Sequence, residues 1–133
     1  MTAGQGFSVD PQAVEKVGMD LVTDYFQEPW QVEHVDREKC GWDITATLGD
    51  ARLCVEVKAT SGPAPTVYVT ANELDKAGTN PDWVIAVVTH AMSDAPLLRW
   101  HTAAEVCAAV KPVVYRARLD PGAGRVRPPS FAP

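Results

Sequence analysis

Apolar residues in the first part of the chain recur every three or four positions, which predicts a helix over residues 11–27. Asp10 is a favourable N-cap residue, and Pro11 fits the first helical position. Pro29 prevents the helix from continuing. The apolar positions that carry the helical pattern are Val14, Val17, Leu21 and Tyr25.

The pattern then changes to an alternation of apolar and polar residues, which is typical of strands. Three strands are predicted, over residues 31–35, 41–48 and 51–59. Gly49 and Asp50 separate the last two strands, and this pair is typical of a two-residue hairpin turn. The second and third strands are therefore expected to pair antiparallel.

A hydroxyl residue followed three positions later by glutamate is typical of a helix start, and this pattern occurs twice in the second half of the chain. Thr70 and Glu73 open a predicted helix that ends near residue 77. Thr102 and Glu105 open another that ends near residue 110. Three further strands are predicted, of which the second is nearly all apolar and expected to be covered on both faces. They span residues 66–69, 83–89 and 112–118.

The predicted order is one helix, four strands, a helix, a strand, a helix and a last strand. One central mixed sheet flanked by helices accommodates this order, so the fold class is α/β, close to α+β. The length of 133 residues fits one domain, which we predict to span residues 1–118. Residues 119–133, which contain Pro, Gly and Arg, are predicted to form a tail.

The predicted hairpin brings two acidic residues together. If Gly49 and Asp50 form the turn, Asp43 lies opposite Glu56, and Lys58 follows two positions later on the same face. Opposed Cβ atoms are about 4.5–5.5 Å apart, a distance at which two carboxylates repel. Mg²⁺ is usually held by one or two carboxylates, so a metal ion would relieve the repulsion and activate a water. A solvated hairpin that carries these charges remains the alternative.

Glu15 provides a second indication of a site. It falls inside the apolar arc of the first predicted helix, and a carboxylate that points toward the core is costly unless it is paired or bound to a metal. The alternative is a residue at the edge of the arc whose carboxylate reaches water.

The charge is unevenly distributed around a net value of −5. The net charge argues against general nucleic-acid coating. Residues 1–50 carry ten acidic and three basic residues. Residues 111–127 carry five basic residues and only one acidic residue, Asp120. This stretch would either contact phosphates or remain a solvated tail.

The sequence also indicates a compartment. The longest apolar runs fall well short of the ~20 residues that span a bilayer, and no export signal is visible. Three cysteines without metal-binding spacing indicate reduced thiols. We therefore expect a cytoplasmic protein with no membrane partner.

Three segments together carry a family resemblance. GWDI (residues 41–44), VEVKAT (residues 55–60) and VTANELDKA (residues 69–77) resemble the NO VEIN carboxy-terminal domain family. The order of Asp43, Glu56 and Lys58 is similar to the signature of the PD-(D/E)xK nucleases. The resemblance extends from about residue 14 to about residue 89.

The resemblance implies a restriction-endonuclease-like core with a metal site. Asp43 and Glu56 would ligate Mg²⁺, or Mn²⁺ as a substitute, with the backbone carbonyl of Val57 as a further ligand. Lys58 would act beside the attacking water, and Glu15 would supply the acidic residue of the first core helix. The implied activity is metal-dependent hydrolysis of DNA phosphodiester bonds, in restriction, repair or defence.

Two features leave alternatives open. The acidic charge favours a catalytically silent module of the same fold that binds protein or nucleic acid. The chain is also little more than the implied core, so a homodimer or a larger protein partner would supply substrate choice.

Overall fold

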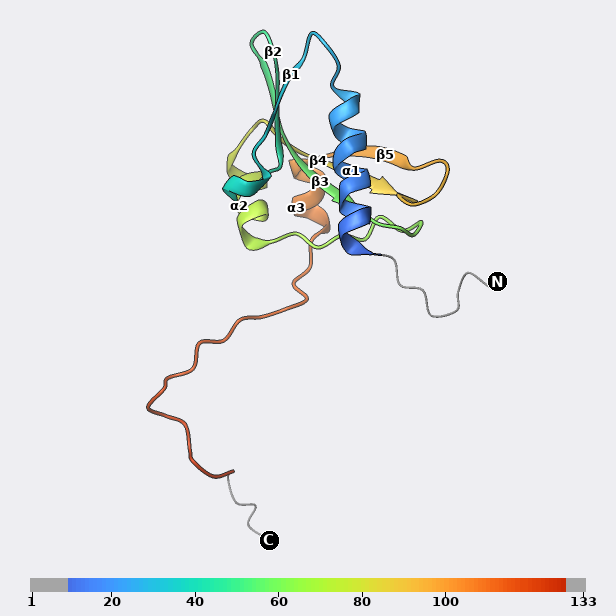
Figure 1. Ribbon diagram of the computed structural model, residues 1–133. Coiled ribbons are helices and arrows are strands. Elements are labelled where there is room, and N and C mark those ends of the chain that lie inside the picture. Colours follow the sequence, from blue (N-terminus) through green and yellow to red (C-terminus); the bar gives the residue numbers. More distant parts are fainter. Residues whose placement is uncertain (1–9, 129–133) are drawn as a thin grey trace, which may run out of the picture.

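A computed structural model describes residues 10–128 and contains a five-stranded sheet with three α-helices (Figure 1). The helices are α1 (Pro11–Tyr25), α2 (Ala71–Thr79) and α3 (Ala103–Ala109). The strands are β1 (Gln31–His34), β2 (Ile44–Leu48), β3 (Ala51–Ala59), β4 (Trp83–Thr89) and β5 (Leu97–Thr102). A short 3₁₀ turn (Asp36–Glu38) links β1 to β2.

The sheet is mixed, and its strands lie in sequence order from β1 to β5. The first three strands form an antiparallel meander, β3 and β4 are parallel, and β4 and β5 are antiparallel. The parallel pair requires a crossover, and α2 lies within it. The predicted class is confirmed: the fold is α+β and consistent with a restriction-endonuclease-like core.

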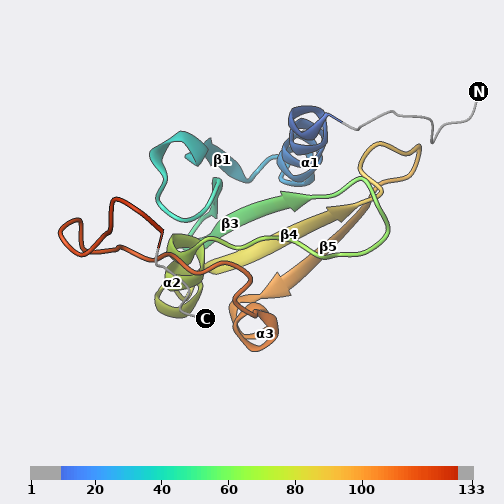
Figure 2. The same cartoon turned by 90° about the horizontal axis from the view of Figure 1, so that it is seen from below.

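The helices cover both faces of the sheet (Figure 2). On one face, α1 packs against β3 so closely that a Cβ on Gly18 would lie 2.7 Å from the Cβ of Ala59. The core on this face includes Val22, Ile44 and Val55. On the other face, α2 and α3 contact each other and enclose a smaller core with the side chains of Ala77, Trp83, Ile85 and Val87.

Several predicted boundaries are confirmed, because strong local signals set them. Asp10 accepts a hydrogen bond from the backbone N–H of Gln12 as the N-cap of α1, and both predicted capping boxes form. The strands over residues 51–59 and 83–89 have the predicted bounds. The α2 helix passes the expected stop at residue 78 and ends at Thr79.

Two predicted strands are wrong, and one observed strand was not predicted. Residues 66–69 form no strand and belong to the irregular connection between β3 and α2. Residues 112–118 form no ladder and are exposed, with Tyr115 83% accessible. Strand β5 was missed because it is a half-exposed edge strand with an irregular apolar pattern. The observed order is therefore helix, three strands, helix, two strands, helix.

The predicted single domain over residues 1–118 stays a prediction, as does the tail that follows it. Among the described residues, helices and strands end at Ala109, and residues 110–128 are exposed. Residues 129–133 of the predicted tail lie outside the described part of the chain. Within residues 10–128, no helix combines the length and the apolar character that a membrane crossing requires.

Candidate functional site

The β2–β3 hairpin has the predicted register. Leu48 pairs with Ala51, and the regular ladder continues to the pair of Ile44 and Val55. Asp43 lies one residue before β2, so it is not the regular ladder partner of Glu56. Its backbone N–H instead donates to the carbonyl of Val55 at 2.8 Å.

The Asp43 carboxylate reaches the backbone of β3. Its Oδ2 accepts a hydrogen bond of 2.9 Å from the N–H of Val57. Burial raises the pKa of Asp43, and this hydrogen bond opposes the shift because it stabilises the carboxylate. The side chain is thus held in a fixed place beside the segment that carries Glu56 and Lys58.

Glu56 is an acidic side chain that is buried in the sheet. It is only 3% exposed, and it points to the α2–α3 face, beside Ile85 of the neighbouring parallel strand. Burial, followed by the negative charge of Asp43, raises the pKa of Glu56 to about 9. The two acids are thus close enough for the charge of Asp43 to act on Glu56, but they are not the directly opposed ladder pair that the hairpin predicted.

Lys58 is held between two glutamates. Its Nζ lies 3.2 Å from Glu56 Oε2 and 2.9 Å from Glu73 Oε1. Burial lowers the pKa of Lys58, but the hydrogen bond to Glu73 and the nearby carboxylates outweigh it, so the pKa is raised. Lys58 is therefore a cation with a fixed position.

Glu73 was predicted only as a helix cap, yet it belongs to the same cluster. Its Oε1 accepts the backbone N–H of Thr70 at 3.0 Å as well as the Lys58 ammonium. Burial raises the pKa of Glu73, but these two donors outweigh it, and the pKa is lowered. The capping box thus turns one carboxylate toward the site. The sequence signal for the cap was clear, but the contact across the crossover was not readable from it.

The loop that carries Asp43 is tied to the rest of the site. Asn72 Nδ2 donates to the carbonyl of Lys39, and Trp83 Nε1 donates to the carbonyl of Gly41, both at 2.9 Å. Gly41 has φ +101°, which favours glycine, and a Cβ there would meet a side chain of α2. Two consecutive residues of α2 therefore hold the site: Asn72 binds the loop that carries Asp43, and Glu73 binds Lys58.

Glu15 does not lie where its helical position indicated. It is exposed, because the buried stripe of α1 consists of Val14, Gly18 and Val22. Glu15 lines a groove between α1 and residues 34–38. None of the contacts described for Asp43, Glu56 and Lys58 involves Glu15.

The donor set fits a magnesium ion held by few protein ligands. Within residues 10–128, no group of three Asp, Glu, His or Cys side chains is placed to hold a metal. Mg²⁺, however, is usually bound by one or two carboxylates and keeps several waters. Asp43 and Glu56 supply two; burial is the first cause of the raised pKa of Glu56, and the repulsion from Asp43, which a cation would relieve, is the second. The predicted role of the Val57 carbonyl stays a prediction.

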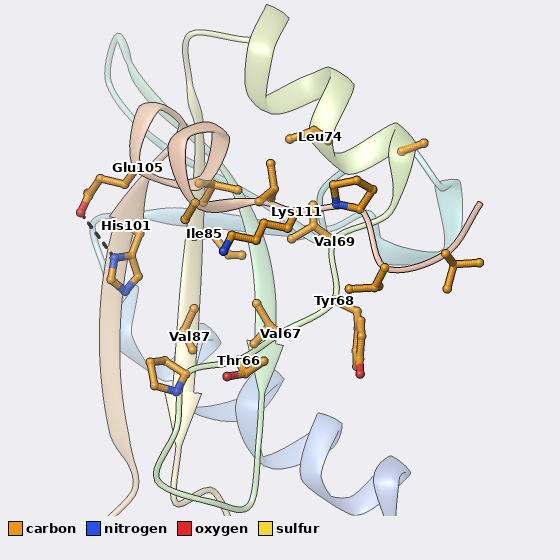
Figure 3. Close-up of a pocket in the computed structure, with 18 residues that line it drawn as sticks. Thr66, Val67, Tyr68, Val69, Leu74, Ile85, Val87, His101, Glu105 and Lys111 are labelled. Carbon is orange, nitrogen blue, oxygen red and sulfur yellow. Dashed lines mark ion pairs between the residues drawn. The ribbon is translucent and has the colours of Figure 1, made fainter. Parts of the chain in front are cut away.

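A mainly apolar pocket of about 920 Å³ lies on the α2–α3 face of the sheet. Its side chains converge from β4, α2, α3 and the irregular residues 65–69 (Figure 3). His101 and Glu105 form an ion pair of 3.6 Å at this pocket. Since Leu74 of α2 lines the pocket, the pocket and the charged cluster share this helix.

One family profile, described as Protein NO VEIN, C-terminal, matches residues 14–102, which is more than half of the chain. The match covers the sheet, α2, most of α1 and all residues of the charged cluster. No match was found among curated proteins or solved structures.

Proposed function

This chain belongs to the NO VEIN C-terminal family, and on that premise we propose that it is a metal-dependent nuclease that hydrolyses DNA phosphodiester bonds. The observation that carries the proposal is the buried Glu56, whose pKa is raised to about 9 beside Asp43 and whose Oε2 lies 3.2 Å from the Lys58 ammonium. Such a strongly perturbed carboxyl group is typical of a functional site. The arrangement of Asp, Glu and Lys is also similar to that of the PD-(D/E)xK nucleases.

Each residue would contribute a separate function. Asp43 and the deprotonated Glu56 would hold Mg²⁺, which supplies an activated water and neutralises charge on the phosphate. Lys58 would place a positive charge beside the phosphate oxygens as negative charge develops on them. Glu73 would keep Lys58 protonated and in position, since its carboxylate raises the pKa of that lysine.

The first test is calorimetric titration with Mg²⁺ and Mn²⁺ of the wild type, Glu56→Gln and the exposed matched control Glu33→Gln. We expect the control to bind like the wild type and Glu56→Gln to lose binding. A supercoiled-plasmid assay with the same proteins should show metal-dependent cleavage by the wild type and the control alone. Metal binding that Glu56→Gln leaves unchanged would remove the site from the proposal.

A catalytically silent module is the second candidate, and the net charge of −5 favours it. In that case the cluster of Lys58, Glu56 and Glu73 has only a structural role. No divalent metal would then support cleavage, while a protein or nucleic-acid partner would still bind. The plasmid assay and a binding assay on one preparation distinguish the two candidates.

A further inference from the structure

The charges of the chain are segregated at residue 110. Up to that residue the sequence holds sixteen acidic and seven basic residues, a formal charge of −9. Residues 111–127, which we name the basic segment, hold five basic residues and only one acidic residue, Asp120. The five are Lys111, Arg116, Arg118, Arg125 and Arg127. The folded part alone therefore repels a polyanion, whereas the basic segment attracts one.

The basic segment is open to solvent. All of its residues are exposed, and within residues 10–128 none of its five cations forms an ion pair or donates a side-chain hydrogen bond to protein. Tyr115 lies next to Arg116 and is 83% exposed, and Val113 is 69% exposed. Tyr115, the one aromatic residue of the basic segment, is suited to stack on a base while the neighbouring cations contact phosphates.

The basic segment starts on the face of the sheet to which Glu56 points. It follows α3, and Lys111, Val113 and Val114 line the same pocket as Ala71 and Leu74 of α2 (Figure 3). Ala71 and Leu74 flank Asn72 and Glu73, which hold the cluster. From this pocket the chain extends away from the sheet (Figure 1). The start of the basic segment therefore lies beside α2, the helix that carries Glu73 of the cluster.

We propose that the basic segment is the nucleic-acid-binding element of this protein and holds the phosphate backbone of DNA beside Asp43, Glu56 and Lys58. The delivery of a scissile phosphate rests on the proposed nuclease function, whereas the binding itself does not require turnover. The acidic folded part gains no counterion release from DNA, so the affinity comes from the five cations and from stacking on Tyr115.

The test is fluorescence anisotropy of the full chain with a short labelled DNA, single-stranded or duplex, in EDTA at several salt concentrations. A variant with Arg116, Arg118, Arg125 and Arg127 all changed to Gln should bind at least tenfold more weakly. The slope of log Kd against log salt should fall by roughly 3 units, since each lost phosphate contact contributes about 0.7–0.9. The same four positions changed to Lys should retain both affinity and slope.

Folding does not confound this comparison, because the four arginines are exposed and form no ion pair with any residue in the described range 10–128. An unchanged Kd and salt slope in the Gln variant would overturn the inference. It would also be overturned if polyglutamate or vesicles with anionic lipid bound the segment and DNA did not.

A failure of the nuclease function can be distinguished from a failure of the binding element. A wild type that binds DNA through the basic segment in EDTA but cleaves none with Mg²⁺ or Mn²⁺ supports the binding element and contradicts the nuclease. Cleavage by the wild type with an unchanged rate and KM in the Gln variant contradicts the binding element alone.

Discussion

The carboxylate of Glu73 and the ammonium of Lys58 are 2.9 Å apart, although they belong to a helix and a strand on either side of a long irregular loop. The same oxygen of Glu73 accepts the N–H of Thr70. The start of α2 and the orientation of the lysine are therefore one structural unit.

Glu73→Gln should separate the two functions of this unit. Glutamine also completes a capping box, so α2 and the thermal stability should be nearly unchanged. The pKa of Lys58 should fall, since the hydrogen bond and the charge of Glu73 raise it. In a nuclease assay we expect roughly tenfold lower kcat, a loss typical of misplaced groups, and an alkaline limb of the pH profile at lower pH.

The matched control is Glu105→Gln. Glu105 occupies the same position in the capping box of α3 and does not contact Lys58. The Glu105→Gln variant should keep the wild-type activity, and the alkaline limb of its pH profile should stay at the wild-type pH. Equal effects of the two substitutions would show that the Glu73 contact to Lys58 has no role beyond capping.

Glu56 should make the stability of the metal-free protein depend on pH. Its pKa is raised to about 9 in the fold, against about 4.3 in an unfolded chain. The stability that protonated Glu56 contributes is therefore complete below the pKa of the unfolded state, and it is lost as the pH rises through the pKa of the folded state. Urea unfolding in EDTA should show wild-type stability falling toward pH 9, and Glu56→Gln should abolish that part of the fall. Identical pH profiles would contradict the assigned shift.

The same proton should compete with the metal. Since Glu56 must lose its proton to become a ligand, Mg²⁺ affinity should rise with pH up to about 9. Titration calorimetry in buffers of different ionisation enthalpy should show proton release on binding. A pH-independent affinity without proton release would mean that Glu56 is not a ligand.

Asn72→Asp should loosen the loop that carries Asp43. The change removes the donor to the carbonyl of Lys39, while an acidic residue near a helix N-terminus remains favourable for α2. We expect metal binding to weaken about fivefold, the equivalent of one hydrogen bond of about 1 kcal/mol. Asp75→Asn on the exposed side of the same helix is the control and should bind metal like the wild type.

Gly18→Ala should test the contact of α1 with the sheet. The added methyl would lie 2.7 Å from the Cβ of Ala59, so we expect a loss of about 1–3 kcal/mol in the free energy of unfolding. Gly78→Ala in α2 is the matched control, because nothing lies within 4 Å of its added Cβ. The control should gain up to about 1 kcal/mol from helix propensity. Chemical denaturation of both variants measures the difference.

The sequence predicted what short-range patterns determine. The turn at Gly49 and Asp50 set the hairpin register, an alternating pattern set the bounds of β3, and an apolar run set those of β4. It could not predict the departure of Asp43 from the ladder or the second contact of Glu73, because residues distant in sequence produce both. Glu15 was misplaced for a related reason: the close approach permitted by Gly18 decides which stripe of α1 is buried.

The parallel pairing of β3 with β4 has a consequence for the order in which the molecule assembles. The hairpin needs only neighbouring residues, but Trp83 must dock before it can anchor the carbonyl of Gly41, 42 positions earlier. Closing such a long loop is entropically costly and is slow compared with hairpin formation. We therefore expect the ionic cluster to be completed late in refolding, at a step that the fluorescence of Trp83 on the docking strand can follow.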